Sequence, residues 1–321
     1  MMPRLRCEPI GDSMRYFDCH ADTLTEMDPA RETLLENGCD VDLARTSAFA
    51  RRYTQVFAVF DDVTHTPDDQ RDARFDQIYA QARRYLDDQC EHISLVTSSA
   101  EMHAAHAAGK AAAFLSIEDA SVMGSRIGEL YDLGFRFCML AWNHDNLYAC
   151  GAVADQAKGL TERGRALASE LVSQGVVMDI SHTSDAGVEE LFSLTEAPIM
   201  ASHSNARDLC GMPRNLARWQ VEELIRRKGL IGLNFFRLFV GGEDASLATL
   251  IRHADYILGM GGEDALALGG DFDGCDGLFP AGIEGVQSMP VLRAAFAEVL
   301  GEDLAEKIFF ANAEAFIDRV L

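Results

Sequence analysis

Short apolar runs alternate with longer amphipathic segments along the whole chain, and this alternation limits the folds open to it. The apolar runs that suit buried strands lie at residues 16–20, 55–60, 112–117, 135–142, 176–181, 198–202, 230–235 and 265–270. Amphipathic helices are expected at residues 71–90, 125–133, 163–174, 184–194 and 221–228. Buried strands that are each followed by a helix are typical of parallel sheets covered by helices. Eight of them predict an α/β fold, the (β/α)₈ TIM barrel.

A doubly wound sheet is the competing fold. It would carry a glycine-rich phosphate turn after its first strand, whereas residues 18–22 here read Asp-Cys-His-Ala-Asp. A length of 321 residues suits one barrel with insertions. Because no Pro/Ser-rich linker, low-complexity tract or repeat divides the sequence, we expect a single domain over residues 1–321.

Charge and composition exclude several classes of partner. A formal net charge of −23 argues against nucleic acid, which needs a basic face. The longest apolar runs fall short of a membrane span, and residues 1–13 lack the apolar core of a secretory signal. The eight cysteines are scattered and form no CxxC pair, so we expect reduced thiols. These features predict a cytoplasmic protein without membrane or nucleic-acid partners.

Ionisable residues stand where the predicted strands end. They are His20 and Asp22 after the first strand, Glu118 after the third, His182 after the fifth, His203 after the sixth and Asp271 after the eighth. One histidine at a strand end is usually structural, but in a barrel all these ends meet at one face. Burying so many ionisable groups without a cation would cost several kcal/mol each. Imidazole and carboxylate are zinc ligands, so the pattern predicts a site for two metal ions.

Five ordered motifs carry a family resemblance. They are Phe-Asp-Cys-His-Ala-Asp at 17–22, Asp-Ile-Ser-His-Thr-Ser-Asp at 179–185, Ala-Ser-His-Ser-Asn at 201–205, Gly-Gly-Asp-Phe-Asp-Gly at 269–274, and Ala-Asn at 311–312 followed by Phe316. Together they resemble the renal (membrane) dipeptidase family, peptidase family M19, in order and in spacing. The resemblance implies a zinc-dependent dipeptidase that uses a metal-bridging hydroxide and tolerates a D-residue at the carboxyl-terminal position.

The resemblance also implies a role for each site residue. One Zn²⁺ would be held by His20 and Asp22, the other by His182 and His203, with Glu118 bridging both; other divalent metals would suit the same donors. Asp271 would take the proton from the bridging water, and Asp273 is the less favoured candidate. Arg214, followed by Asn215, would bind the terminal carboxylate of a small dipeptide substrate.

The fourth predicted strand departs from the family pattern. Trp142 stands where animal members carry a histidine that contacts the substrate. His144 lies two residues further on, so strand alternation could bring it to the site in a catalytic or substrate-binding role. A loop histidine is the equal alternative. Asn143 could supply a further donor, and Phe239 falls where some relatives carry a tyrosine that contacts substrate.

Other functions stay open at this point. A different binuclear amidohydrolase could act on a cyclic amide, a β-lactam or an N-acyl amino acid, and a barrel could serve a peptide pathway as a non-catalytic or tailoring partner. Family members are often homodimers, so a homodimer is an expectation. His103 and His106 could share a helix face and bind metal, but their Ala-rich polar segment favours a solvated helix.

Overall fold

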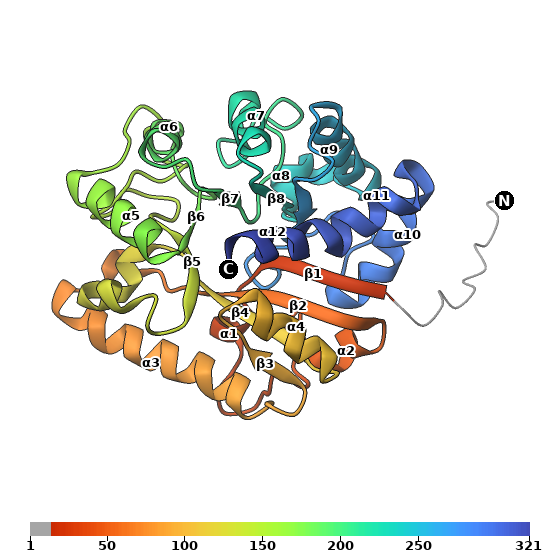
Figure 1. Ribbon diagram of the computed structural model, residues 1–321, viewed down its shortest axis with the longest axis horizontal. Coiled ribbons are helices and arrows are strands. Elements are labelled where there is room, and N and C mark those ends of the chain that lie inside the picture. Colours follow the sequence, from red (N-terminus) through yellow and green to blue (C-terminus); the bar gives the residue numbers. More distant parts are fainter. Residues whose placement is uncertain (1–13) are drawn as a thin grey trace.

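The computed structural model describes residues 14–321, in which parallel strands close into a barrel surrounded by helices (Figure 1). The strands of the ring are β1 (Met14–Ala21), β2 (Ala50–Val59), β4 (Ala111–Ile117), β5 (Phe135–Met139), β6 (Val177–Asp179), β7 (Met200–Ala201), β8 (Leu230–Leu233) and β9 (Leu266–Leu268). Their order is β2-β1-β9-β8-β7-β6-β5-β4, and the pairing of β2 with β4 closes the ring. A short additional strand, β3 (Ile93–Leu95), pairs with the start of β4. The predicted (β/α)₈ barrel is confirmed.

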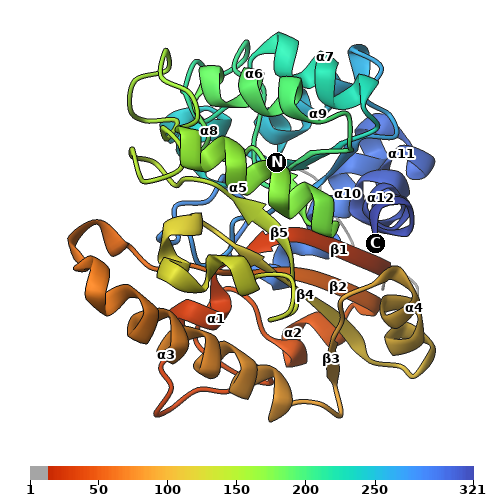
Figure 2. The same ribbon diagram turned by 60° about the vertical axis from the view of Figure 1, so that its left-hand side comes forward.

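Helices form the outer layer of the barrel (Figures 1 and 2). They are α1 (Thr23–Glu26), α2 (Leu43–Ser47), α3 (Asp68–Asp87), α4 (Ser99–Ala107), α5 (Glu162–Gln174), α6 (Asp185–Leu194), α7 (Arg218–Arg226), α8 (Arg237–Val240), α9 (Leu247–Gly259), α10 (Met289–Leu300), α11 (Glu302–Glu306) and α12 (Asn312–Val320). Local sequence sets their ends. At α5, the Thr161 side chain accepts a hydrogen bond from Gly164 N, and Gly175 ends the helix with a φ of 90°.

Two predicted elements differ most from the structure. The helix expected at 125–133 is a 3₁₀ helix, η2 (Ala120–Glu129), which is kinked at Gly124 with a φ of 55°. The kink brings the backbone N–H of Ser125 to Asp72 of α3, to which it donates at 2.7 Å. The strand expected at 135–142 ends at Met139. The chain then leaves the sheet in a loop that carries the predicted substrate residues.

Apolar side chains fill the end of the barrel where the strands begin. Phe17, Phe114 and Phe137 of the strands pack there with Phe316 and Ile317 of α12, in one buried cluster. Figure 1 shows α12 lying beside β1. Since this end is plugged by side chains, chemistry is confined to the opposite end, where the strands finish.

Two further predictions concern the chain as a whole. All seven cysteines among residues 14–321 are free thiols, as expected. No helix within that part of the chain is long and apolar enough to cross a membrane. Residues 1–13, on which the expected lack of a signal segment rests, lie outside the described residues.

Candidate metal centre

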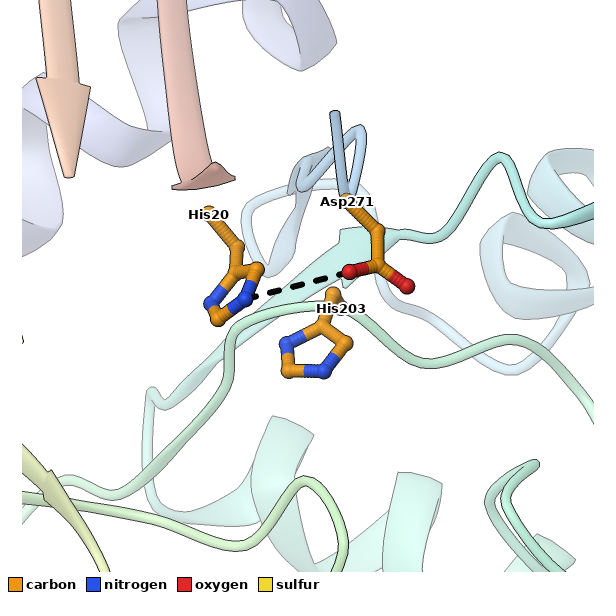
Figure 3. Close-up of side chains that lie close together, drawn as sticks. All are labelled: His20, His203 and Asp271. Carbon is orange, nitrogen blue, oxygen red and sulfur yellow. Dashed lines mark ion pairs between the residues drawn. The ribbon is translucent and has the colours of Figure 1, made fainter. Parts of the chain in front are cut away.

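The predicted ligands converge at the carboxyl end of the barrel, although they come from five strands. His20 and Asp22 belong to the end of β1, and the loops after β4, β6, β7 and β9 supply the others, which are Glu118, His182, His203 and Asp271. All six are buried, with at most 8% of any residue exposed. Figure 3 shows the His20 and His203 rings facing each other beside Asp271, and their centroids are 3.9 Å apart.

The first donor group contains His20, Asp22 and one oxygen of Glu118. His20 Nε2 lies 3.1 Å from Glu118 Oε2 and 3.4 Å from Asp22 Oδ2. Potential ligand atoms of these residues all lie within 4.8 Å of one another. Asp271 Oδ1 lies 3.8 Å from the same nitrogen of His20 (Figure 3). One imidazole and two carboxylates are a donor set that divalent zinc accepts.

The second donor group uses the other oxygen of Glu118. His182 Nε2 lies 2.9 Å from Glu118 Oε1 and 2.9 Å from His203 Nε2, and His203 Nε2 lies 3.9 Å from Glu118 Oε1. The two oxygens of Glu118 therefore face different groups. A carboxylate in that position is able to bridge two cations.

Hydrogen bonds at the far side of the His182 and His203 rings fix which nitrogen faces the centre. Asn143 Oδ1 lies 2.9 Å from His182 Nδ1 and can only accept, so Nδ1 carries the proton and Nε2 keeps its lone pair. Ser202 Oγ holds His203 Nδ1 at 2.7 Å. Neither ring nitrogen of His20 has a hydrogen-bond partner within residues 14–321. Lone pairs directed at a shared buried space fit a bound cation, and partners behind the rings are usual for metal ligands.

The electrostatics of the cluster favour a cation. Burial, together with the nearby charge of Asp22, raises the pKa of Glu118 to about 8. Burial alone would lower the pKa of His20, but the charges of Glu118 and Asp22 outweigh it and raise that pKa. Burial, with Arg214 and His20 nearby, lowers the pKa of His182. Closely packed carboxylates thus repel each other here, and a divalent cation would offset that repulsion.

Two buried aspartates that the sequence analysis did not single out hold the ligand loops. Asp18 Oδ1 accepts hydrogen bonds from the backbone N–H groups of His20 and Gly270, both at 3.0 Å. Asp179 Oδ1 accepts in the same way from Ser181 and Ser202, also at 3.0 Å. Each carboxylate therefore joins two neighbouring strand ends. Their positions, two and three residues before a ligand histidine, are the signal that could have identified them.

Close packing around the cluster requires glycine and unusual backbone angles. A Cβ atom at Gly274 would lie 2.5 Å from Asp22 Oδ2 and 2.5 Å from Asp271 Oδ1, so only glycine allows both oxygens to approach. His182 and Asp271 adopt left-handed φ values of 68° and 57°. Such conformations persist where the surroundings impose them, as at functional sites.

Arg214 is buried beside the cluster instead of lying at the surface. Its residue is 4% exposed, and its contacts are two long hydrogen bonds, from Nη1 to Ser204 Oγ at 3.5 Å and from Nη2 to His203 O at 3.4 Å. Its Nε has no partner in the described part of the chain. Phe239 lies against the guanidinium, with its ring centroid 5.4 Å from Cζ. Asn215 donates instead to the backbone oxygens of Cys210 and Phe239, both at 2.8 Å, and so fixes the surrounding loops.

The loop after β5 places Trp142 and Asn143 against the predicted metal ligand His182, whereas His144 of the same loop lies away from the ligands. The Trp142 ring stacks on the His182 ring, with centroids 6.0 Å apart. Asn143 holds the same histidine, as described above. His144 is exposed, and its ring meets the edge of Trp142 at 6.1 Å. It lines a pocket with Trp142 and Phe60, beside the metal ligands and not among them.

A (β/α)₈ barrel with such a buried donor set at its carboxyl end is suited to metal-dependent hydrolysis. The sequence model described as membrane dipeptidase, peptidase family M19, matches residues 5–315. The chain therefore belongs to the membrane dipeptidase family, a family of metallo-dipeptidases, as its motifs predicted.

Individual relatives agree with this assignment. A metallo peptidase from Rhodobacter sphaeroides, liganded with a phosphinate mimic of the dipeptide L-Ala-D-Ala, is 26% identical, with a TM-score of 0.83 over 97% of this chain and 100% of that one. Dipeptidase AC, also of family M19, is 26% identical, with a TM-score of 0.86 over 96% of this chain and 99% of that one. An uncharacterized dipeptidase of Schizosaccharomyces pombe is 34% identical over 179 residues, which are 54% of this chain but only 44% of that protein.

Proposed function

We propose that this chain hydrolyses dipeptides with a free carboxyl-terminal carboxylate, with two divalent cations, expected to be Zn²⁺, bridged by Glu118. Tolerance of a D-residue at the carboxyl-terminal position is part of the proposal. It is supported by the Rhodobacter sphaeroides relative, whose ligand mimics L-Ala-D-Ala. The observation that carries the proposal is the buried, weakly bonded guanidinium of Arg214 beside the metal donors.

A buried guanidinium is costly unless an anion joins it. Arg214 offers five N–H donors, and its two long contacts leave most of them available. A substrate carboxylate can occupy such a fork through two parallel hydrogen bonds. Because Arg214 lies close to the metal ligands, a substrate anchored there would present an amide bond a few atoms away. The site therefore selects short substrates that end in a carboxylate.

The remaining residues divide the chemistry among them. When bound, the cations supply an acidified water and a Lewis acid for the scissile carbonyl. Asp271, whose Oδ2 accepts a hydrogen bond from Asn234 Nδ2 at 2.8 Å, is placed to take the proton of the attacking water. Burial raises the pKa of Asp271, which makes it a stronger base than an exposed carboxylate. His144, exposed beside Trp142, is proposed to contact the substrate side chain from the loop.

A dipeptide panel with metal analysis on the same preparation tests the proposal. The panel contains L-Xaa-L-Xaa and L-Xaa-D-Xaa dipeptides and the same pairs blocked as carboxamides, each with and without a chelator. We expect two metal ions per chain and rapid cleavage of the free acids, with the carboxamides cleaved only slowly; the chelator should abolish cleavage and Zn²⁺ should restore it. Full metal content without any dipeptide cleavage would mean that the site acts on another amide substrate. Cleavage without metal would refute the metal-dependent reaction.

Replacing Arg214 by methionine tests the carboxylate contact. Charged hydrogen bonds contribute about 1.5–3 kcal/mol each, so losing a bidentate pair should lower kcat/KM for free-acid dipeptides by about 10²–10⁴-fold. The slow cleavage of carboxamide-blocked dipeptides should change little. Arg218→Met, at the exposed start of α7, is the matched control. An equal fall for free acids and carboxamides would contradict the role of Arg214 as the carboxylate anchor.

A further inference from the structure

A second group of histidines and carboxylates lies away from the catalytic end, between α4 and α12. His103 and His106 are one turn apart on α4, and Glu314 and Asp318 are one turn apart on α12. One potential ligand atom from each of His103, His106 and Glu314 lies within 4.8 Å of the others. Figures 1 and 2 both show these two helices close together near the carboxyl terminus. The helix predicted for the Ala-rich segment around His103 and His106 is thus present as α4, but it is not exposed to solvent on all sides.

The His106 ring is fixed with one nitrogen free. Its Nε2 lies 3.2 Å from the backbone oxygen of Tyr53 and 3.0 Å from Thr54 Oγ1, both in β2. A carbonyl can only accept, so Nε2 carries the proton and Nδ1 keeps its lone pair. Nδ1 is buried and has no hydrogen-bond partner among residues 14–321. A backbone carbonyl behind the ring is the usual support of a metal-binding histidine.

The His103 ring has the same arrangement, with a carboxylate behind it. Its Nε2 lies 2.7 Å from Asp318 Oδ1, which also accepts from the Ser99 hydroxyl. Its Nδ1 lies 3.8 Å from Glu314 Oε1. That oxygen is buried without a hydrogen-bond partner in the described chain. A carboxylate that holds the outer nitrogen of a histidine is a recurring feature of zinc sites.

We propose that His103 Nδ1, His106 Nδ1 and Glu314 Oε1 bind one Zn²⁺, with Asp318 holding His103 in place. Two imidazoles and one carboxylate leave a fourth position for water. Zinc–ligand bonds of about 2.0–2.2 Å require donor atoms roughly 3.3 Å apart. The present spacing needs a contraction of about 1 Å, which the side chain of His103, 45% exposed, can supply by rotation.

Two arginines set the strength of this site. Arg15 Nη1 lies 3.7 Å from the other oxygen of Glu314, and Arg52 Nη1 lies 4.0 Å from Oε1. Their charges compete with a cation for Glu314, so the site should be weaker than the catalytic centre. Zinc bound here would join α4 to α12, which is separated from it by about two hundred residues and plugs the barrel. Its expected effect is on stability and not on the chemistry.

Metal content and melting temperature of the full-length protein test the proposal. At saturating Zn²⁺ the wild type should hold one ion per chain more than His103→Gln or Glu314→Gln. The extra ion should raise the Tm of the wild type but not of His103→Gln or Glu314→Gln. Asp318→Asn should retain the ion with an affinity about 10–100-fold lower, because it removes only the support of a ligand. Dipeptide hydrolysis by all three variants should match the wild type.

The matched control is His92→Gln, an exposed histidine outside the cluster. It should bind as much zinc as the wild type. The use of two variants on different helices guards against a single substitution that disturbs folding. Equal zinc content in the wild type, His103→Gln and Glu314→Gln would overturn the proposal, and so would a loss of zinc in His92→Gln as large as in His103→Gln.

Discussion

Glu118→Gln should abolish dipeptide hydrolysis, with kcat/KM reduced by about 10³-fold or more. The side chain faces both donor groups, with Oε2 at 3.1 Å from His20 and Oε1 at 2.9 Å from His182. An amide keeps the shape but loses the charge and one of the two acceptor oxygens, so both cations should bind more weakly. A loss of several kcal/mol of transition-state stabilisation corresponds to the stated factor. Steady-state kinetics and metal content measure the two effects together.

In metal-free protein, the same substitution should raise the stability of the fold. Burial and Asp22 raise the pKa of Glu118 to about 8 in the folded state, from about 4.5 when unfolded. Folding therefore becomes less favourable as pH rises from about 4.5 to 8, and glutamine removes that loss. Chelated Glu118→Gln should melt above the chelated wild type, by a margin that grows across this pH range. Glu298→Gln, exposed on α10, is the control and should alter neither activity nor melting. Retained activity would refute the bridging role.

Asp271→Asn should lower kcat by about 10²–10⁴-fold while the metal content stays unchanged, because general-base catalysis contributes on that scale. Asparagine tolerates the left-handed φ of 57° at this position, so the backbone should be preserved. It can also still contact Asn234. The change therefore removes the proton acceptor with little other disturbance. Loss of one cation in this variant would instead show that Asp271 is a ligand, as its 3.8 Å distance from His20 Nε2 would allow.

Asp273→Asn is the matched control for this experiment. Asp273 also has a left-handed φ, of 67°, but its oxygens accept from the Asp40 backbone at 2.6 Å and from Thr23 Oγ1 at 2.5 Å. It braces the loop, so we expect less than about a tenfold fall in kcat. A fall in kcat as large as that of Asp271→Asn would mean that the two aspartates act together in catalysis.

The barrel was predictable because its strands are buried on both faces and therefore read as continuous apolar runs. The short strands were predicted too long: β7 has two residues, since the chain after Ala201 turns immediately into the ligand loop. The 3₁₀ segment around Gly124 was missed because a tertiary contact to Asp72, and not local propensity, sets its shape. The hydrophobic periodicity of a sequence carries no information about such a contact between distant residues.

The convergence of the proposed metal donors was predictable in the same way, since all of them lie at or just after strand ends. The sequence could not show how deeply a side chain is buried. Arg214 was assigned to the substrate carboxylate by the family resemblance alone, because nothing in its polar loop segment indicates that the fold buries it beside the cluster. Asp18 and Asp179 do have a local signal, because each stands two or three residues before a predicted ligand histidine. Their supporting roles could not be derived from that signal, because each role depends on a backbone N–H from another strand end.

The spread of the donors along the chain has a consequence for how the protein acquires its metals. The first group is complete only with residue 118 and the second only with residue 203, while Asp271 follows near the end. A nascent chain leaving the ribosome therefore cannot hold both of the proposed cations until most of it has been synthesised. Affinity for divalent first-row metals follows a general order, so metal availability determines selectivity together with geometry and ligand type. The metal pool that the newly completed chain meets should thus influence which ions it carries.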